Sequence, residues 1–595
     1  MESYIPKEFV PNDHKYELVS IINDIHALSN GDEFHLKKVI RKYPKNGTGI
    51  YTKREIVHGF HYFSGENDWD EDLFFKRLKL KPIRTASGVA PVTVLTKPFP
   101  CPAKCIFCPN DVRMPKSYMS EELGAKRAAQ HAFDPYVQTM SRLKTYKYNG
   151  HPPNKVELIV LGGTWTSYPQ AYQIWFVKRC FDAMNDFTGK EEFGRHLLEH
   201  QMDFSDLDYQ IDGENIDKSY NDVVSSHLKR NLEGKLLHST ESADWSELEA
   251  AQRENVSSRH RCVGLVLETR PDEISETEVE KLRRLGATKV QIGIQSLSDR
   301  VLEMNKRGHD VARTRDAIRL LREAGFKIHA HWMANLYGAT PESDIEDFRK
   351  LFDDPAIRPD ELKLYPCSLV QNAELMTKYR EGSWKAYEHD ELLEVMEKSL
   401  TYVPEYCRVT RVMRDIPPPE IIVGNKLTNF RQIANNHLEE RKLEQSDIRS
   451  REIRTDQIEV DELECKVVPY DTSTGPEKFI QIITPENRIV AFLRLSLPTK
   501  PSFLPELGPN AIIRELHVYG PVVDFGKTDE AKSQHLGLGT LLIKKAEEIA
   551  REYQFKAISV ISAIGTRDYY RKKGFEEGPL YMHRDLRLPS ESSLS

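Results

Sequence analysis

Strand-length apolar runs alternate with amphipathic segments through the middle of the chain. The runs lie at residues 156–161, 263–267, 290–295, 327–333 and, shorter, 362–365. Apolar positions at helical spacing predict helices over 275–285 and 311–324, each between two of these runs. Because repeated strand–helix units place their strands side by side in one direction, the pattern predicts a parallel sheet.

The two ends of the chain have other patterns. Residues 14–42 show the spacing of two helices, which the turn residues at 44–47 end. Further along, polar and apolar positions alternate over 479–484 and 488–497, which predicts a hairpin. After the hairpin, the pattern predicts a strand over 512–519, a helix that begins near 537, and a strand over 557–561.

These changes of pattern divide the chain into four predicted regions, because 595 residues are too many for one hydrophobic core. We expect a helical, basic region over 1–75, a strand–helix domain over 76–400, a linker over 401–460 and an α+β domain over 461–595. The linker is rich in arginine, which suggests contact with the other domains and with RNA. A polar segment at 190–254 interrupts the strand–helix series, and we interpret it as a partly helical surface insertion without evident chemistry.

Charge and composition narrow the class of protein. The chain is 39% hydrophobic and 29% charged, as in soluble proteins, and no apolar run has the length of a membrane span. The first residues lack the order of a signal peptide. The eight cysteines do not look like a disulfide framework, so we expect a cytoplasmic protein without membrane contact. The net charge of −7 argues against a uniformly basic nucleic-acid binder.

One stretch is nevertheless locally basic. It contains no acidic residue, and its cationic side chains are Lys37, Lys38, Arg41, Lys42, Lys45, Lys53 and Arg54. Such a stretch is suited to binding phosphate groups. A solvated helix face followed by a loop explains the same charges equally well.

Three cysteines carry the strongest chemical signal. Cys101, Cys105 and Cys108 have C-x3-C-x2-C spacing and follow an apolar run at 92–95. Soft thiolate ligands select zinc, copper(I) or an iron–sulfur cluster. Three of them hold three irons of a [4Fe–4S] cluster and leave the fourth iron open, as radical S-adenosylmethionine (SAM) enzymes require. A zinc site completed by a distant histidine and three buried free thiols are the alternatives.

With this chemistry, the expected form of the parallel sheet is a partial or complete TIM-like barrel with its site at the strand C-termini. Gly162, Gly163 and Thr164 directly follow one strand, so exposed backbone is able to approach the amino group of SAM. A simple turn is the alternative reading of these glycines.

A second glycine loop opens a helix near the C-terminus. Gln534, Gly537, Leu538, Gly539 and Thr540 form the loop and the start of the helix, where free backbone N–H groups suit a pyrophosphate. A strand and then Tyr569 and Tyr570 follow. This order resembles a GCN5-related acetyltransferase, in which such tyrosines lie by the thioester of acetyl-CoA. Core packing is the alternative for the two tyrosines and is the expected role of one of them.

Together with the segments 154–164, 268–272, 514–520 and 569–572, these motifs resemble the catalytic third subunit of Elongator and its single-chain prokaryotic relatives across nearly the whole chain. The short spacing of the first two cysteines is nearer the compact prokaryotic members. The resemblance implies a tRNA carboxymethyluridine synthase, a transferase that modifies C5 of wobble uridine 34. It also implies tRNA, through its anticodon stem-loop, as a partner and either a homodimer or an Elongator-like assembly.

The resemblance also assigns residues. It implies that Cys101, Cys105 and Cys108 bind the cluster, and that acetyl-CoA contacts the positions Lys155, Glu515, Leu516, His517, Val518, Leu538, Gly539, Thr540 and Tyr570. The implied chemistry is hydrogen abstraction from the acetyl methyl group, addition to uridine C5 and thioester hydrolysis, with each cofactor supplying the hard step. The two sites must then face each other across the domain junction, with the uridine extruded from its stack.

Two other functions are compatible with parts of the sequence. The first is a protein lysine acetyltransferase with a structural cluster, in which Glu515 or His517 is the general base. The second is a non-catalytic tRNA-binding scaffold, which the basic N-terminal stretch and the arginine-rich linker suggest.

Overall fold

A seven-stranded parallel sheet forms the largest unit of the protein. The computed structural model describes residues 9–28, 33–78, 88–188, 219–232, 234–414, 416–453, 460–519 and 537–587. The sheet contains β1 (Ala90–Leu95), β2 (Lys155–Leu161), β3 (Arg261–Thr269), β4 (Lys289–Gln295), β5 (Lys327–Ala334), β6 (Glu361–Pro366) and β8 (Arg408–Arg411), in that order. Every neighbouring pair is parallel. Each predicted strand of this region is therefore confirmed.

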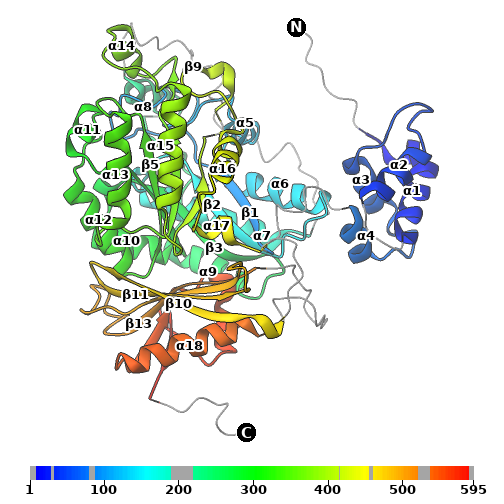
Figure 1. Cartoon of the computed structure of the whole chain (residues 1–595). Helices are drawn as coiled ribbons and strands as arrows, with labels where there is room; N and C mark the ends of the chain where they lie inside the picture. Colours follow the sequence, from blue (N-terminus) through cyan, green and yellow to red (C-terminus); the bar gives the residue numbers. More distant parts are fainter. Residues whose placement is uncertain are drawn as a thin grey trace.

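Helices cover the outer face of this sheet (Figure 1). They include α6 (Pro135–Tyr148), α7 (Gln170–Asp186), α9 (Trp245–Asn255), α10 (Glu276–Arg284), α12 (Val311–Glu323), α13 (Pro341–Asp353) and α15 (His389–Tyr402). Because strand order follows chain order and the sheet curls without pairing β1 to β8, the fold is a parallel half-barrel. The partial form of the predicted TIM-like barrel is thus confirmed.

The predicted linker at 401–460 contributes to this same unit. Its first part forms β8, which pairs with β6, and α16 (Phe430–Glu440) then packs against α15. The short α17 (Ile448–Arg451) contacts β8. The sequence did not predict this four-residue strand, because arginines stand at both of its ends, Arg408 and Arg411, and no apolar run marks it.

The predicted insertion at 190–254 is described from Ser219 onward, except at residue 233. It contains α8 (Tyr220–Asn231) and most of α9, which packs against α7. The absence of evident chemistry in this segment stays a prediction, and the structure gives it a supporting role, because α8 holds the cysteine loop as described below.

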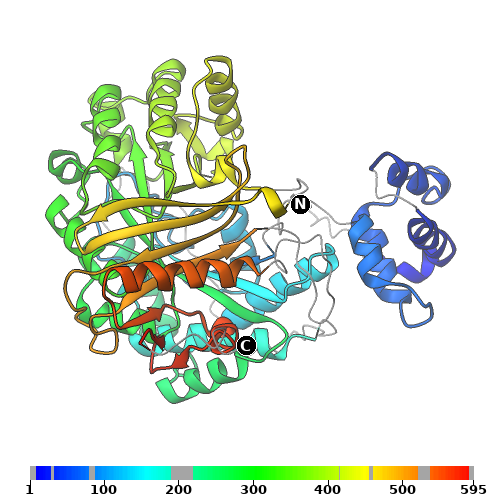
Figure 2. The same ribbon diagram turned by 60° about the horizontal axis from the view of Figure 1, so that its bottom comes forward.

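The second sheet is mixed and belongs to the C-terminal region. Its order is β10 (Glu464–Thr472), β11 (Gly475–Ile483), β12 (Ile489–Ser496), β13 (Ala511–Val518), β14 (Ala557–Val560), β16 (Met582–Asp585) and β15 (Glu576–Glu577). The predicted hairpin is β11 and β12, which pair antiparallel. Figures 1 and 2 place this sheet between α18 (Leu538–Glu552) and the half-barrel. The arrangement is α+β, as predicted.

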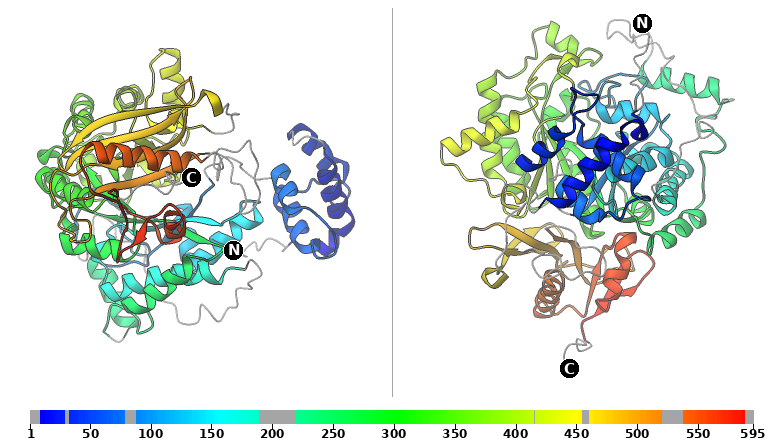
Figure 3. Two further views of the ribbon diagram at one scale, coloured as in Figure 1. Left: turned by 90° about the horizontal axis from the view of Figure 1, so that it is seen from below. Right: turned by 90° about the vertical axis from the view of Figure 1, so that its right-hand side faces the viewer.

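Four helices form a separate N-terminal group: α1 (Lys15–Ala27), α2 (Glu33–Lys42), α3 (Lys53–Phe63) and α4 (Glu71–Leu78). They have their own apolar core, which includes Ile21, Phe60 and Phe74. Figure 3 shows the group to one side of the half-barrel, where His58 and His61 of α3 contact Tyr148 of α6. The assignment of 1–75 as a tRNA-binding region stays a prediction.

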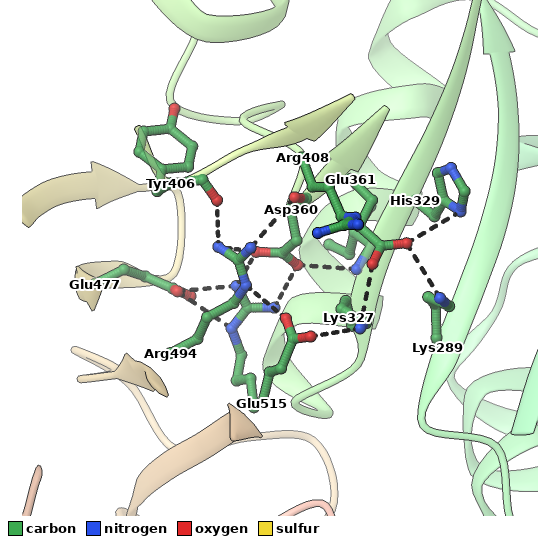
Figure 4. A network of polar contacts seen from close by, with 12 residues as sticks. Lys289, Lys327, His329, Asp360, Glu361, Tyr406, Arg408, Glu477, Arg494 and Glu515 are labelled. Carbon is green, nitrogen blue, oxygen red and sulfur yellow. Dashed lines mark hydrogen bonds and ion pairs between the residues drawn. The ribbon is translucent and has the colours of Figure 1, made fainter. Parts of the chain in front are cut away.

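Buried ion pairs join the second sheet to the half-barrel (Figure 4). Arg514 of β13 donates to both oxygens of Asp360, at 2.6 and 2.8 Å, and to Glu477 of β11 at 2.9 Å. None of these three side chains is exposed. Arg494 of β12 pairs with Glu515 at 2.9 Å. Because all these charges have partners, the two units meet without an unpaired buried ion among these residues.

Candidate functional site

The three cysteines lie in the loop after β1, at the edge of the half-barrel where its strands end. All three are free thiols, and less than a tenth of each residue is exposed. Asn221 of α8 supports the loop, because its amide donates to the Cys101 carbonyl at 2.7 Å and accepts from the Cys101 N–H at 2.9 Å. A helix from the insertion therefore fixes the backbone of the first cysteine.

Two buried arginines lie against the second cysteine. Arg307 donates to Cys105 Sγ at 3.1 Å and Arg270 donates to it at 3.5 Å. A hydrogen bond from Cys108 holds the pKa of Cys105 well below its usual range, and the two guanidinium groups add to this effect against the opposing effect of burial. The same hydrogen bond and burial raise the pKa of Cys108. A thiolate is thus favoured at Cys105, and thiolates are the metal ligands.

These residues fit an iron–sulfur cluster. Within the described parts of the chain, no three His, Cys, Asp or Glu side chains converge closely enough to hold a single metal ion. A cluster takes each thiolate on a different iron, so its sulfurs need not meet at one point. Three buried thiols from one loop, with cations beside one of them, suit this type of cofactor.

The glycine turn after β2 packs directly against the cysteine loop. Thr164 Oγ1 lies 3.7 Å from Cys101 Sγ. A Cβ on Gly162 would lie 1.9 Å from Thr96 Oγ1, and one on Gly163 would lie 2.7 Å from the Lys116 carbonyl oxygen. The absence of side chains therefore permits this close approach. Contact between the turn and SAM stays a prediction.

A cavity of about 190 Å³ opens beside the cysteine loop. Cys108 and Arg307 line it, together with inward-facing residues of three strands: Glu268 of β3, His331 of β5 and Lys363 of β6. Glu268 accepts a hydrogen bond from the Tyr118 hydroxyl at 3.0 Å. Polar side chains of the barrel interior therefore lie in the same cavity as Cys108, as predicted from the strand order.

A larger cavity of about 560 Å³ lies between the two sheets. On one side it is lined by the interior of the half-barrel. On the other side it is lined by Glu515, Leu516, His517 and Tyr570 of the C-terminal region. These four residues are among the positions that the sequence assigned to acetyl-CoA.

The second sheet opens at this cavity. β13 and β14 pair only through Ala511, Ile512 and Ile513, and β14 ends at Val560 while β13 continues to Val518. The two strands therefore part where Glu515 to Val518 begin. β13 continues past the end of β14, so within the described residues its backbone has no strand partner on that side. An extended chain such as a pantetheine arm fits beside such a strand, because it can bond to these backbone groups.

Helix α18 begins next to the parted strands. Gly537 caps it in a left-handed conformation, at φ 70°, without a side-chain cap, and Leu538, Gly539 and Thr540 form its first turn. This 15-residue helix presents a positive dipole end that suits a pyrophosphate. Lys573 donates to Thr540 Oγ1 at 2.6 Å, which adds a cation at the same end.

The two tyrosines of α19 (Arg567–Arg571) lie in different places. Tyr570 is buried and lines the larger cavity. Tyr569 is 38% exposed, and a Cβ on Gly539 would lie 2.4 Å from its hydroxyl, so it borders the start of α18 instead. Burial raises the pKa of both, to about 12 for Tyr569. The structure therefore gives the two residues separate surroundings, and their catalytic role stays a prediction.

Glu515 and His517 are the candidate bases of the acetyltransferase alternative. Burial would raise the pKa of Glu515, but Lys327 and Arg494 outweigh it and lower this pKa. The carboxylate is ion-paired to these residues at 2.5 and 2.9 Å. Burial lowers the pKa of His517 to about 4, so its imidazole is neutral at pH 7. Glu515 is thus a poor base, and His517 remains available as an acceptor.

The other positions predicted to contact acetyl-CoA are not among the residues that line the larger cavity. Lys155 begins β2, at the opposite end of that strand from Gly162, and burial lowers its pKa. Its ladder partner Arg261 lies against Gly565 of the C-terminal region, so this strand end borders the second unit. Val518 ends β13. Gln534 lies outside the described residues.

Sequence reasoning missed several residues of the site. Arg307, Asn221, His331 and Lys363 come from separate elements and meet only in the folded chain. One signal was present in the sequence: β5 and β6 carry polar residues at every second position, as at His329 and His331, although both strands are otherwise apolar. Such alternation indicates side chains that face a polar barrel interior.

Comparisons with known proteins agree with this geometry. The radical SAM superfamily profile matches residues 235–354, and the radical SAM C-terminal domain profile matches residues 359–440. The second match includes β8, in agreement with its place in the half-barrel.

Relatives extend the similarity to most of the chain. A tRNA uridine(34) acetyltransferase of Methanocaldococcus infernus is 35% identical over 86% of this chain and 88% of its own. Elongator complex protein 3 of Danio rerio is also 35% identical, over 86% of both chains. The solved structure of the Methanocaldococcus infernus archaeal Elp3, with an N-terminal deletion, matches at a TM-score of 0.65 and 32% identity, over 84% of this chain and 99% of that one.

Proposed function

The chain belongs to the family of Elongator complex protein 3 and the tRNA uridine(34) acetyltransferases, and we propose that it is a radical SAM enzyme that carboxymethylates C5 of the tRNA wobble uridine. The observation that carries the proposal is the position of the two cavities. One is lined by Cys108 of the cysteine loop and the other by residues of the parted strands β13 and β14, and interior residues of the half-barrel line both.

Each half of the proposed reaction has residues suited to it. Cys101, Cys105 and Cys108 would hold the [4Fe–4S] cluster, which with SAM supplies the radical that abstracts hydrogen. The first turn of α18 would bind the pyrophosphate of acetyl-CoA, and the parted strands would hold its pantetheine arm.

Interior side chains of the half-barrel and side chains of the second sheet surround the proposed reaction space. Tyr570 and His517 border the region where the thioester would enter, and both are uncharged at pH 7 because burial opposes ionisation. A homodimer or an Elongator-like assembly stays a prediction, as does the cytoplasm. No helix in the described residues is long and apolar enough to span a bilayer.

An anaerobic assay tests this function. The reconstituted protein is mixed with SAM, dithionite, acetyl-CoA and a tRNA that carries uridine 34, and mass spectrometry measures 5′-deoxyadenosine and modified nucleosides. Carboxymethyluridine is expected with the native chain and is expected to disappear in Cys101→Ser, Cys105→Ser and Cys108→Ser. Cys465→Ser, which changes an exposed thiol on β10, is the matched control and keeps the product.

Two outcomes would contradict the proposal. Deoxyadenosine without a modified uridine would retain the radical site but assign another substrate. Protein acetylation that survives all three cysteine variants would favour the lysine acetyltransferase alternative.

A further inference from the structure

The two cavities adjoin inside the half-barrel. Three residues line both of them: Leu161 of β2, Lys363 of β6 and Arg411 of β8. Along β6, every second residue faces this interior: Glu361 lines the larger cavity, Lys363 lines both, and Tyr365 lines the smaller one. Lys363 therefore lies at the boundary between the larger cavity, which the positions assigned to acetyl-CoA line, and the smaller cavity, which Cys108 lines.

The lysines of this interior differ in their partners. Lys289 pairs with Glu157 and Glu361, and Lys327 pairs with Glu361 and Glu515. Figure 4 shows both lysines directed at Glu361, and Lys327 also at Glu515. Each of these two ammonium groups is thus neutralised by two acidic neighbours.

Lys363 has a neutral partner instead. Its ammonium donates to Oε1 of Gln291, which also bonds His331 at 3.0 Å, and no carboxylate in the described residues is within ion-pair distance of it. Burial lowers the pKa of Lys363 to about 8, and Arg411 adds to this effect, whereas Glu268 opposes it. An ammonium in such surroundings gains from a further oxygen acceptor, because it has three N–H donors and the acceptor it bonds here, Gln291, is uncharged.

We propose that Lys363 binds the carbonyl oxygen of the acyl thioester at the boundary between the two cavities. The inference rests on the proposed function and adds a residue to it. The larger cavity connects the region of Glu515, His517 and Tyr570 to Lys363 without leaving the interior. A carbonyl held by Lys363 orients the acyl methyl group toward the smaller cavity, where Cys108 lies.

A binding measurement tests Lys363 without any turnover. Calorimetry compares CoA with an acetyl-CoA analogue in which a methylene group replaces the thioester sulfur, on the full-length reconstituted protein without reductant. In Lys363→Met, the affinity for the analogue is expected to fall about tenfold, the loss typical of one charged hydrogen bond. The affinity for CoA, which has no acyl oxygen, is expected to stay unchanged. Lys363→Arg keeps the charge and is expected to retain most of the preference for the analogue.

The matched control is Lys289→Met, which removes a lysine of the same interior that lines only the larger cavity. It removes one cation from Glu157 and from Glu361, and Glu361 keeps Lys327, so stability should fall while the preference for the analogue over CoA remains. An equal loss of CoA and analogue affinity in both Lys363→Met and the milder Lys363→Gln would assign a structural role to Lys363 and overturn the proposal.

Label transfer separates this proposal from the proposed function. With trideuteroacetyl-CoA, SAM and dithionite, the native protein is expected to move deuterium into 5′-deoxyadenosine. In Lys363→Met, deoxyadenosine formation should continue while its deuterium content falls about tenfold. If the native protein transfers no deuterium, the proposed function itself fails. If the native protein and Lys363→Met transfer it equally, only the role of Lys363 is overturned.

Discussion

Buried histidines give this site a pH dependence at the residue scale. His517 faces the larger cavity, and burial lowers its pKa to about 4, from an ordinary value of 6.5. The unfolded chain therefore binds more protons than the folded one between pH 4 and 6.5. By linkage, His517 makes the folded state less stable as the pH falls through this window, and its effect is absent above pH 6.5.

A single substitution isolates this contribution. His517→Gln has no titrating group, so the free energy of unfolding of this variant should fall less than that of the native chain between pH 6.5 and 4. Urea unfolding at several pH values measures the difference. Parallel curves for the two proteins would show that His517 is protonated as easily in the folded state as in the unfolded one.

At the scale of elements, two turns determine where the reactive groups lie. The turn after β2 holds the cysteine loop, because Gly163 has φ 84° and lies against the Lys116 carbonyl. The start of α18 borders Tyr569 through Gly539. At Gly163 a side chain would meet backbone, so the close approach requires glycine, whereas at Gly539 a side chain would displace only the Tyr569 hydroxyl.

Gly163→Ala tests the first of these turns. A methyl group there adds the strain of a left-handed backbone and a contact of 2.7 Å with backbone, so we expect a loss of roughly 1–3 kcal/mol in stability. Displacement of the loop should also lower the iron retained after reconstitution. Iron analysis and thermal unfolding measure the two effects.

Gly234→Ala is the matched control for this variant. Gly234 has the same φ of 84°, but a Cβ there meets nothing within 4 Å. It should therefore show the backbone strain alone and normal iron content. Equal iron loss in both variants would remove the role assigned to the close approach at Gly163.

At the scale of the whole molecule, the two sheets are held together by charges that neither unit could bury alone. Arg514 of the second sheet lies between Asp360 of the half-barrel and Glu477 of its own sheet. Burial would raise the pKa of Asp360, but Arg514 and Arg494 hold it well below its usual range. Asp360 thus stabilises the folded state above its ordinary pKa, and this contribution is lost as the pH falls below that value.

Arg514→Met is expected to be strongly destabilising, by roughly 3–5 kcal/mol, because it removes the nearest cation from two buried carboxylates and leaves them with arginines at 3.5 Å. Thermal unfolding at pH 7 measures the loss. Arg587→Met, which changes an exposed arginine paired with Asp585, is the control and should have no measurable effect. A similar melting temperature for all three proteins would show that the ion pairs do not hold the two sheets together.

The sequence by itself determined the local features of this protein. Apolar runs of strand length located β2 to β6, and helical spacing located α10 and α12, because burial requires these periods wherever the elements pack. The spacing of Cys101, Cys105 and Cys108 predicts them as cluster ligands, since the three residues are close along the chain. Short-range patterns of this kind do not depend on the rest of the fold.

The tertiary structure alone decided how distant residues meet. β8 was too short and too charged to be recognised, and it joins the sheet because β6 offers a pairing edge. Asn221 supports Cys101 from 120 positions away, and Arg307 reaches Cys105 from 202. Lys363 lies between two cavities only because seven strands curl around it. Such contacts depend on the path of the whole chain, which no local pattern of residues contains.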